Sequence, residues 1–462
     1  MNVMTTDALY QALVRALGCS AVKMDIQTLL AHSGDWSEVE RQRPSMVLFP
    51  ATPQQVAQAL GLICKARRKV VVQGGLTGLA GGATPHEGEI VISLIRLDQV
   101  EACDWLGGTA TVQGGITLEA LHSYLEPEGW TFPLDLGARG SCQLGGNAAT
   151  NAGGNKVIRY GTMRGLVLGI EVALPDGTLL TMLNEVTKNT TGLDLKQLFI
   201  GSEGTLGIIT RLTLKLSPLP RMTQTALVAL NAFEDAAALL KDLRGCFAGL
   251  SAFELMWDSF MQAATKASGS ALPFSERYAL YALIEVQGAN DAVDREALEC
   301  FLGDALERGQ VGDAVVAASI ADATRLWKQR ESIAELLSEM KPAAPFDIGL
   351  PLGETGPFVA SLQARLGAAF PAQQHLFFGH LGDGNLHVLS GPCPDQAERH
   401  ALESMVYESV TAARGCISAE HGIGVLKQSF LPLSRSAEEL AIMRQIKALF
   451  DPMNVLNSNR VF

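Results

Sequence analysis

Three glycine-rich segments within the first 210 residues constrain the fold of this chain more than any other feature. They read VVVQGGLTGLAGG (70–82), DLGARGSCQLGGNAATNAGG (135–154) and LFIGSEGTLGIIT (198–210). Glycine has no side chain, so it allows tight turns and a close approach of the backbone to a ligand. Each segment alone could be an ordinary turn. Three in succession indicate a ligand-binding domain.

The first segment follows an apolar strand pattern, as a nucleotide-binding turn would, but it matches neither common phosphate-binding motif. A Rossmann turn has G-x-G-x-x-G spacing and leads directly into a helix. Here more glycine and then Pro85 follow, and proline and glycine disfavour a helix. A Walker motif would need G-K-[ST], which the segment lacks. We therefore interpret it as a loop whose backbone N–H groups bind a pyrophosphate without a helix.

Composition and charge limit the classes of partner. Hydrophobic residues make up 47% of the 462 residues, which allows two or three well-packed domains. A net charge of −12 disfavours nucleic acid and anionic membranes. No stretch reaches the roughly 18 apolar residues of a membrane span, and the scattered cysteines suit a reducing compartment. We expect a cytoplasmic protein, with peripheral attachment to the inner membrane as the alternative.

The pattern of expected strands and helices changes near SPLPRM (217–222). Before this point, short strand patterns are separated by turn signals. After it, strand patterns such as 278–288 alternate with amphipathic helical patterns such as 289–309. This alternation favours a second domain built on an antiparallel sheet, so the expected fold class is α+β.

Two histidines bracket a glycine-rich turn in GHLGDGNLH (379–387). An unbroken strand would point His380 and His387 to opposite faces, but the Gly-Asp-Gly between them predicts a bend that turns both rings inward. Further along, SAEHGIG adds Glu420 and His421 between small residues. Two imidazoles, one carboxylate and an open position suit zinc or a similar divalent ion. The spacing is not that of H-E-x-x-H.

In order and spacing, the glycine-rich segments resemble the flavin domain of the FAD-linked oxidases with the vanillyl-alcohol-oxidase (PCMH-type) fold. The resemblance implies that the first two segments surround the FAD pyrophosphate and that the second and third flank the ring. The residues implied near FAD are Gly74, Gly75, Thr77, Gly78, Gly145, Gly146, Thr150, Asn151, Gly153, Glu203, Gly204 and Ile208. The first loop contains no histidine that could attach the flavin, so we expect non-covalent FAD.

GHLGDGNLH and SAEHGIG together resemble the D-2-hydroxy-acid dehydrogenase branch of this family, especially D-2-hydroxyglutarate and D-lactate dehydrogenases. The resemblance covers roughly residues 40–460. It implies a metal held by His380, His387 and Glu420, with zinc preferred and manganese as the alternative. The other roles that it implies are a general base at His421, a substrate-carboxylate site at Arg330, and a ligand-orienting or turn-forming role for Asn385.

The implied reaction oxidises a D-2-hydroxy acid by proton removal from the hydroxyl and hydride transfer to flavin N5. The implied electron acceptor is a quinone or an electron-transfer flavoprotein, and the implied assembly is a homodimer. The implied domains are an N-terminal helical segment (1–41), a PCMH-type FAD domain (42–220), a substrate domain (221–415) and a C-terminal segment (416–462) that completes the active site and packs on the FAD domain.

Three departures from the family bear on the substrate. Ala334, Pro345 and Leu389 stand where hydroxyglutarate-specific members carry Thr, Lys and Asn for the distal carboxylate. Burying that carboxylate without partners would cost several kcal/mol. We expect a monocarboxylic D-2-hydroxy acid with a small or apolar side chain, such as D-lactate.

Four alternative functions remain open. One is D-2-hydroxyglutarate oxidation, and another is the non-redox chemistry of alkyl-dihydroxyacetone-phosphate synthases. The others are an electron-transfer subunit of a glycolate-oxidase-type complex and a binding protein with a structural metal. The presence of all four His and Glu candidates argues against the electron-transfer subunit, for which a broken metal site is expected. The synthase would need a phosphate site and a lipid tunnel, and the sequence shows no clear sign of either.

Overall fold

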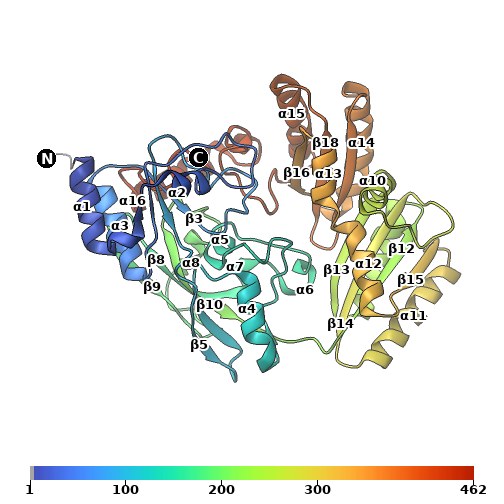
Figure 1. Cartoon of the computed structure of the whole chain (residues 1–462). Coiled ribbons are helices and arrows are strands. Elements are labelled where there is room, and N and C mark those ends of the chain that lie inside the picture. Colours follow the sequence, from blue (N-terminus) through green and yellow to red (C-terminus); the bar gives the residue numbers. More distant parts are fainter. Residues whose placement is uncertain (1–4) are drawn as a thin grey trace. The chain divides into compact units, whose positions relative to one another are not determined.

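The computed structural model describes residues 5–462 and divides into two compact units (Figure 1). Unit 1 is the part of the chain up to Gly154, together with Gly161–Leu219 and Glu420–Phe462. Unit 2 comprises Asn155–Tyr160 and Pro220–Ala419. Both units are therefore discontinuous in sequence. Within residues 5–462, no helix has the length and apolar character needed to cross a membrane.

The first sheet of unit 1 has the strand order β1-β2-β4-β3, in which β2, β4 and β3 run parallel and β1 is antiparallel to β2. Leu9 and Leu13 from α1 and Leu60 and Ile63 from α3 are fully buried against it. The elements are α1 (Thr6–Leu17), β1 (Val22–Lys23), α2 (Ile26–Ala31), β2 (Met46–Leu48), α3 (Pro53–Lys65), β3 (Val70–Gln73) and β4 (Ile90–Ser93).

The second sheet of unit 1 is antiparallel and has the order β5-β6-β10-β8-β9. Asp176-Gly177 forms the turn between β8 and β9, and Gly177 has a φ of +89°, which glycine adopts without strain. The strands are β5 (Val100–Asp104), β6 (Thr109–Gln113), β8 (Val167–Ala173), β9 (Leu179–Met182) and β10 (Ile208–Lys215).

Short helices and a two-stranded ribbon complete unit 1. The ribbon pairs β7 with β11. These elements are α4 (Leu118–Leu125), β7 (Trp130–Thr131), α5 (Leu144–Ala149), α7 (Met163–Leu166), α8 (Lys196–Phe199), β11 (Ser217–Pro218) and the late helix α16 (Ala437–Phe450). The segment after α16 returns to the first sheet, where the N–H of Asn457 donates to the carbonyl of Val70.

Unit 2 is built on a seven-stranded antiparallel sheet with the order β15-β12-β14-β13-β17-β18-β16. The strands are β12 (Met222–Leu230), β13 (Leu250–Trp257), β14 (Leu280–Gly288), β15 (Asp313–Val316), β16 (Ala344–Gly349), β17 (Gln374–His380) and β18 (Asn385–Gly391). The helices are α6 (Val157–Tyr160), α9 (Phe233–Cys246), α10 (Asp258–Ser268), α11 (Asp291–Glu307), α12 (Ile320–Arg330), α13 (Ile333–Glu339), α14 (Thr355–Ala369) and α15 (Gln396–Ala412).

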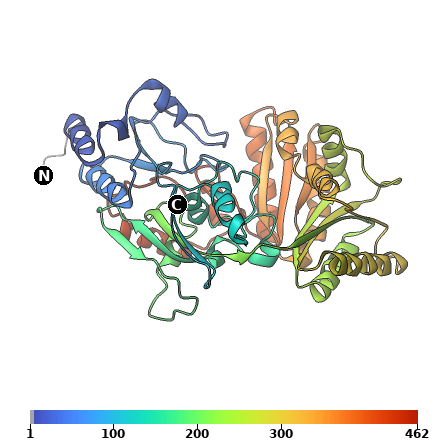
Figure 2. The ribbon, with the colours of Figure 1, turned by 60° about the horizontal axis from the view of Figure 1, so that its bottom comes forward.

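Helices cover both faces of this sheet (Figure 2). One face packs against α9 and α11 through a cluster that includes Phe253 and Ile284. The other packs against α10, α12 and α13 through a cluster that includes Met256, Phe378 and Leu389. Side chains alternate between the faces along each strand, so the second face also receives the polar residues described below.

Candidate active site

A hairpin places His380 and His387 on the same face of the unit 2 sheet. β17 ends at His380 and β18 begins at Asn385, so the predicted Gly-Asp-Gly bend is present. His387 pairs with Phe378, two residues before His380, and the side chains of both histidines therefore leave the same face. Their ring centroids are 5.3 Å apart. Gly384 adopts a φ of +85°, which lets the turn close.

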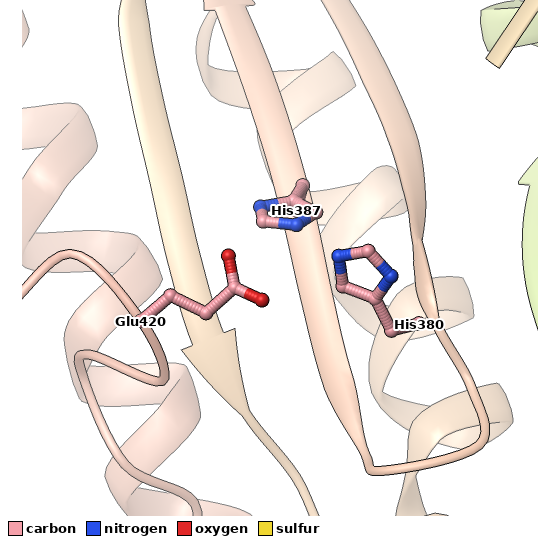
Figure 3. A group of neighbouring side chains, drawn as sticks. All are labelled: His380, His387 and Glu420. Carbon is pink, nitrogen blue, oxygen red and sulfur yellow. The ribbon is translucent and has the colours of Figure 1, made fainter. Parts of the chain in front are cut away.

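Glu420 completes a group of three candidate metal ligands (Figure 3). It directly follows a segment fastened to β16, where the N–H of Ala419 donates to the carbonyl of Asp347. The ligand atoms of His380, His387 and Glu420 all lie within 4.8 Å of one another. Two imidazole nitrogens and a carboxylate oxygen at this separation fit a divalent ion and leave a position for substrate or water. His421, the predicted base, follows Glu420 and is half-buried.

Glu254 on β13 contacts this group, although no motif in the sequence marks it. Its Oε1 accepts a hydrogen bond from His380 Nδ1 at 2.6 Å, and its Oε2 accepts one from Arg330 Nε at 2.8 Å. Burial alone would raise the pKa of the Glu254 carboxyl, but the charges of His380 and Arg330 outweigh it and hold the pKa below its usual value. Glu254 is thus an ionised carboxylate at the centre of the sheet.

Arg330 is a buried residue and not an exposed helix-face charge. It ends α12, and its side chain is 5% exposed. Its guanidinium lies over the ring of Phe378 at 4.7 Å, and Phe378 also stacks on His387. Arg330 therefore belongs to the same polar group as the two histidines.

Asn385 begins β18 and hydrogen-bonds to Asp347 on β16. Its Nδ2 donates to Asp347 Oδ1 at 3.1 Å, and Ser418 Oγ donates to the other carboxylate oxygen at 3.4 Å. Asn385 Oδ1 is buried and has no hydrogen-bond partner among the described residues. Asp347, which the sequence analysis did not select, thus ties the start of β18 to the segment leading to Glu420.

Two of the three residues predicted to determine the substrate lie on the strands that carry or flank His387. Leu389 follows His387 by two residues on the same face of β18 and is buried in the apolar cluster with Phe378. Pro345 is its cross-strand partner on β16. Ala334 lies at the start of α13, four residues after Arg330.

Unit 1 contains a cavity of about 520 Å³ lined by two of the predicted cofactor residues, Gly74 and Gly75. A Cβ on Gly75 would lie 1.8 Å from the carbonyl oxygen of Ser141, so only glycine fits there. Gln143 also lines the cavity, and its buried Oε1 has no partner among the described residues. A bare backbone and an unpaired polar atom fit a large polar ligand such as a dinucleotide. Sequence reasoning missed Gln143 and His32, which lines the same cavity.

The other residues of the first segment lie in the loop after β3. Thr77 is half-buried, and Gly78 is exposed. A Cβ on Gly78 would lie 3.5 Å from the carboxylate of Asp35. Neither is among the residues that line the cavity.

The second glycine-rich segment forms the short helix α5. A Cβ on Gly145 would lie 2.9 Å from the Gly114 carbonyl, whereas one on Gly146 would enter open space. Thr150 Oγ1 donates to the Gly146 carbonyl at 3.1 Å. Asn151 Oδ1 accepts from the N–H of Arg164 at 2.9 Å. Gly153 is buried just beyond the helix.

In the third segment, the Glu203 carboxylate binds the backbone just after Glu420. Its two oxygens accept from the N–H groups of Ile423 at 2.7 Å and Gly424 at 2.8 Å. Burial raises the pKa of the Glu203 carboxyl, whereas these two hydrogen bonds act to lower it. Glu203 thus anchors the segment that carries Glu420 and His421.

The two other residues predicted in this segment have structural contacts. Ile208 begins β10 and is buried in the core of unit 1. Gly204 has a φ of +70°, and a Cβ there would lie 2.8 Å from the side chain of Val72.

Comparisons with known proteins match nearly the whole chain. A family model for an FAD binding domain matches residues 44–183, and one for the C-terminal domain of FAD linked oxidases matches residues 219–461. The mitochondrial D-2-hydroxyglutarate dehydrogenase of Bos taurus is 42% identical over 92% of this chain and 78% of its own. A D-2-hydroxyglutarate dehydrogenase of Xanthomonas citri is 37% identical over 99% of this chain and 97% of its own. A Schizosaccharomyces pombe protein, provisionally named a mitochondrial D-lactate dehydrogenase, is 38% identical over 94% of this chain and 84% of its own.

Solved structures confirm the predicted fold. The crystal structure of p-cresol methylhydroxylase with substrate bound has a TM-score of 0.78 at 15% identity and covers 98% of this chain and 96% of its own. A structure of alkyldihydroxyacetonephosphate synthase has a TM-score of 0.76 at 16% identity, and the match covers 98% of this chain and 86% of the synthase chain. At such low sequence identity, these structural similarities establish the fold but say nothing about the activity.

Proposed function

Because this chain belongs to the FAD-linked oxidases, we propose that it is a metal-dependent flavoenzyme that oxidises a D-2-hydroxy acid to the 2-oxo acid. The observation that carries this proposal is the grouping of His380, His387 and Glu420 within 4.8 Å. Arg330 joins that group through Glu254. FAD, held without a covalent bond by Gly74, Gly75 and the other residues predicted near it, would accept the hydride from C2 of the substrate.

The metal would be zinc, with manganese as the alternative, held by His380, His387 and Glu420. When bound, it would polarise the hydroxyl and carboxylate of the substrate and lower the pKa of the hydroxyl. Two imidazoles and a carboxylate are a usual protein ligand set for an open, catalytic zinc site.

This chain's own residues would bind the acid and move its proton. Arg330 would hold the substrate carboxylate, because a planar guanidinium can donate two parallel hydrogen bonds to it. His421 would take the proton from the C2 hydroxyl, since imidazole has an unperturbed pKa near ~6.5 and can accept a proton at neutral pH. Asn385 would orient a ligand at the start of β18, where its Oδ1 has no protein partner among the described residues.

The substrate would be a monocarboxylic acid with a small or apolar side chain, such as D-lactate. Leu389 is buried among apolar residues, Pro345 pairs with it across the strands, and Ala334 brings only a methyl group. These residues offer a second carboxylate no hydrogen bond from a side chain. The alternative is D-2-hydroxyglutarate, which the names of the bovine and Xanthomonas relatives support.

Turnover of D-lactate, D-2-hydroxyisovalerate, D-phenyllactate and D-2-hydroxyglutarate with an artificial electron acceptor would test the substrate. We expect a monocarboxylic acid to have the highest kcat/KM. A higher value for D-2-hydroxyglutarate would show that the substrate assignment is wrong.

Anaerobic addition of the preferred acid would test the reaction itself. We expect bleaching of the flavin absorbance, and loss of that bleaching after treatment with EDTA. A flavin that stays oxidised with every acid would favour an electron-transfer subunit or a binding protein.

The flavin would be reoxidised by a quinone or an electron-transfer flavoprotein, and the enzyme would act as a homodimer.

A further inference from the structure

We propose that Glu254 is a positioning residue that orients a metal ligand and the substrate-binding arginine with one buried carboxylate. This inference rests on the proposed roles of His380 and Arg330. Glu254 lies on β13, directly opposite His380 on β17, in the middle of the unit 2 sheet. Its side chain is 0% exposed, so water cannot replace either of its partners.

The hydrogen bond to Glu254 determines which nitrogen of His380 can bind a metal. The carboxylate of Glu254 accepts from Arg330 with one oxygen and lies 2.6 Å from Nδ1 of His380 with the other, so this geometry assigns the donated proton to Nδ1. A neutral imidazole then has its lone pair on Nε2. A carboxylate behind a histidine ligand fixes the tautomer and ring orientation in many metal sites.

The second oxygen of Glu254 orients Arg330. Oε2 accepts from Nε at 2.8 Å, which is the inner edge of the guanidinium. The two terminal nitrogens are then the pair that remains for a substrate carboxylate. The ring of Phe378 lies against the flat face of the guanidinium, with its centroid 4.7 Å from Cζ of Arg330. The guanidinium is therefore held at its edge by Glu254 and on its face by Phe378.

Stability alone does not explain a carboxylate in this position. Buried ion pairs lose the solvation of both charges, and replacing them with well-packed apolar residues is often neutral or stabilising. Apolar side chains such as Met256 and Phe378 surround this point of the sheet and could have filled it. The carboxylate instead meets two residues of the proposed site.

Glu254→Gln tests the inference in the purified flavoprotein. A glutamine keeps the shape but replaces one oxygen with an NH2 donor, so it cannot accept at both positions, one facing His380 and the other facing Arg330. The matched control is Glu285→Gln, because Glu285 is also buried in this sheet but accepts from Ser251 at 2.7 Å and is placed in no binding role. Flavin content and melting temperature establish that each variant is folded.

The first measurement is the dissociation constant for Zn²⁺ without substrate, by competition with a chelating dye. We expect about 10–100-fold weaker binding for Glu254→Gln and no change for Glu285→Gln. The second is KM for the preferred acid at saturating Zn²⁺. We expect it to stay roughly tenfold higher in Glu254→Gln, because Arg330 has lost a charge-assisted hydrogen bond.

The inference is overturned if Glu254→Gln matches wild type in both Zn²⁺ affinity and KM. If Glu254→Gln does not fold, Glu254→Asp replaces it, because the shorter carboxylate keeps the charge but cannot reach both partners at the original distances. Unchanged values for Glu254→Asp would then overturn the inference. Wild-type protein that binds neither Zn²⁺ nor Mn²⁺ would instead contradict the proposed function, and this inference with it.

Discussion

His421 is the residue on which the proposed proton transfer depends. It follows Glu420 directly and is half-buried, so a base would stand next to the metal-binding carboxylate. We expect His421→Asn to lower kcat/KM for the preferred acid by about 10²–10⁴-fold, the usual contribution of a general base. Flavin content and Zn²⁺ affinity should not change. Steady-state assays would measure this, with His400→Asn on the exposed face of α15 as the control. A loss below tenfold would exclude His421 as the base.

Ala334 permits a direct test of substrate choice, because it lies in the first turn of α13, four residues after Arg330, and its side chain is exposed. Ala334→Thr adds a hydroxyl, and Ala334→Val adds the same shape without it. We expect Thr to raise kcat/KM for D-2-hydroxyglutarate relative to D-lactate by roughly tenfold, the value of a hydrogen bond to a charged group. Val should leave the ratio unchanged. Equal ratios in the two variants would contradict a substrate-determining role for this position.

Single residues differ in how far the sequence could reveal their partners. The pairing of His380 with His387 was predictable, since a local glycine turn brings them together. Glu254 was not, because its contact with His380 joins positions 126 residues apart and depends on the strand order of the sheet. Glu203 was predicted near the flavin from a motif, but the backbone that binds its carboxylate lies 220 residues further along the chain.

The β17–β18 hairpin is the element that presents both histidines, and its turn depends on Gly384. A Cβ at this position would lie 2.5 Å from the carbonyl oxygen of Leu350, at a φ of +85°. We expect Gly384→Ala to destabilise the turn by about 1–3 kcal/mol and to weaken Zn²⁺ binding. Thermal unfolding and dye competition would measure these effects.

Gly367→Ala is the matched control for the hairpin, because a Cβ there meets no atom within 4 Å and the residue lies in the helix α14. Alanine favours a helix over glycine by about 1 kcal/mol, so this variant should be as stable as wild type or more so. If Gly384→Ala behaved like Gly367→Ala, the turn would not need its left-handed conformation.

The helix α16 fastens the C-terminal segment of unit 1 through Lys447. Its Nζ donates to the carbonyls of Thr205 and Leu456, each at 2.7 Å, and to Asp451 at 2.6 Å. Lys447→Met would leave Asp451 as a buried carboxylate without its ion-pair partner, so we expect a loss of about 3–5 kcal/mol. Arg444→Met, exposed on the same helix, should change stability by less than about 0.5 kcal/mol. Chemical denaturation would measure both, and equal losses would contradict the anchoring role.

At the scale of the whole molecule, the proposed flavin and metal sites use different residues but share unit 1. The cavity lined by Gly74 and Gly75 belongs to unit 1, as does Glu420, whereas His380 and His387 belong to unit 2. Because none of His380, His387 and Glu420 lines the cavity, removing one group should leave the other bound. We expect dialysis against EDTA to remove Zn²⁺ and abolish bleaching by the acid, while the flavin absorbance remains. Dialysis without EDTA is the control, and added Zn²⁺ should restore bleaching.

The flavin, in turn, can be removed with the variant Gly75→Ala. Its new Cβ would lie 1.8 Å from the carbonyl oxygen of Ser141. Because that contact is impossible, the loop must move away from the cavity, and we expect the variant to purify without flavin. It should still bind Zn²⁺, since His380 and His387 belong to unit 2 and only Glu420 shares unit 1 with the altered loop. Flavin absorbance and dye competition on one preparation would measure both. Loss of Zn²⁺ binding together with the flavin would mean that the two sites assemble as one, so that neither forms without the other.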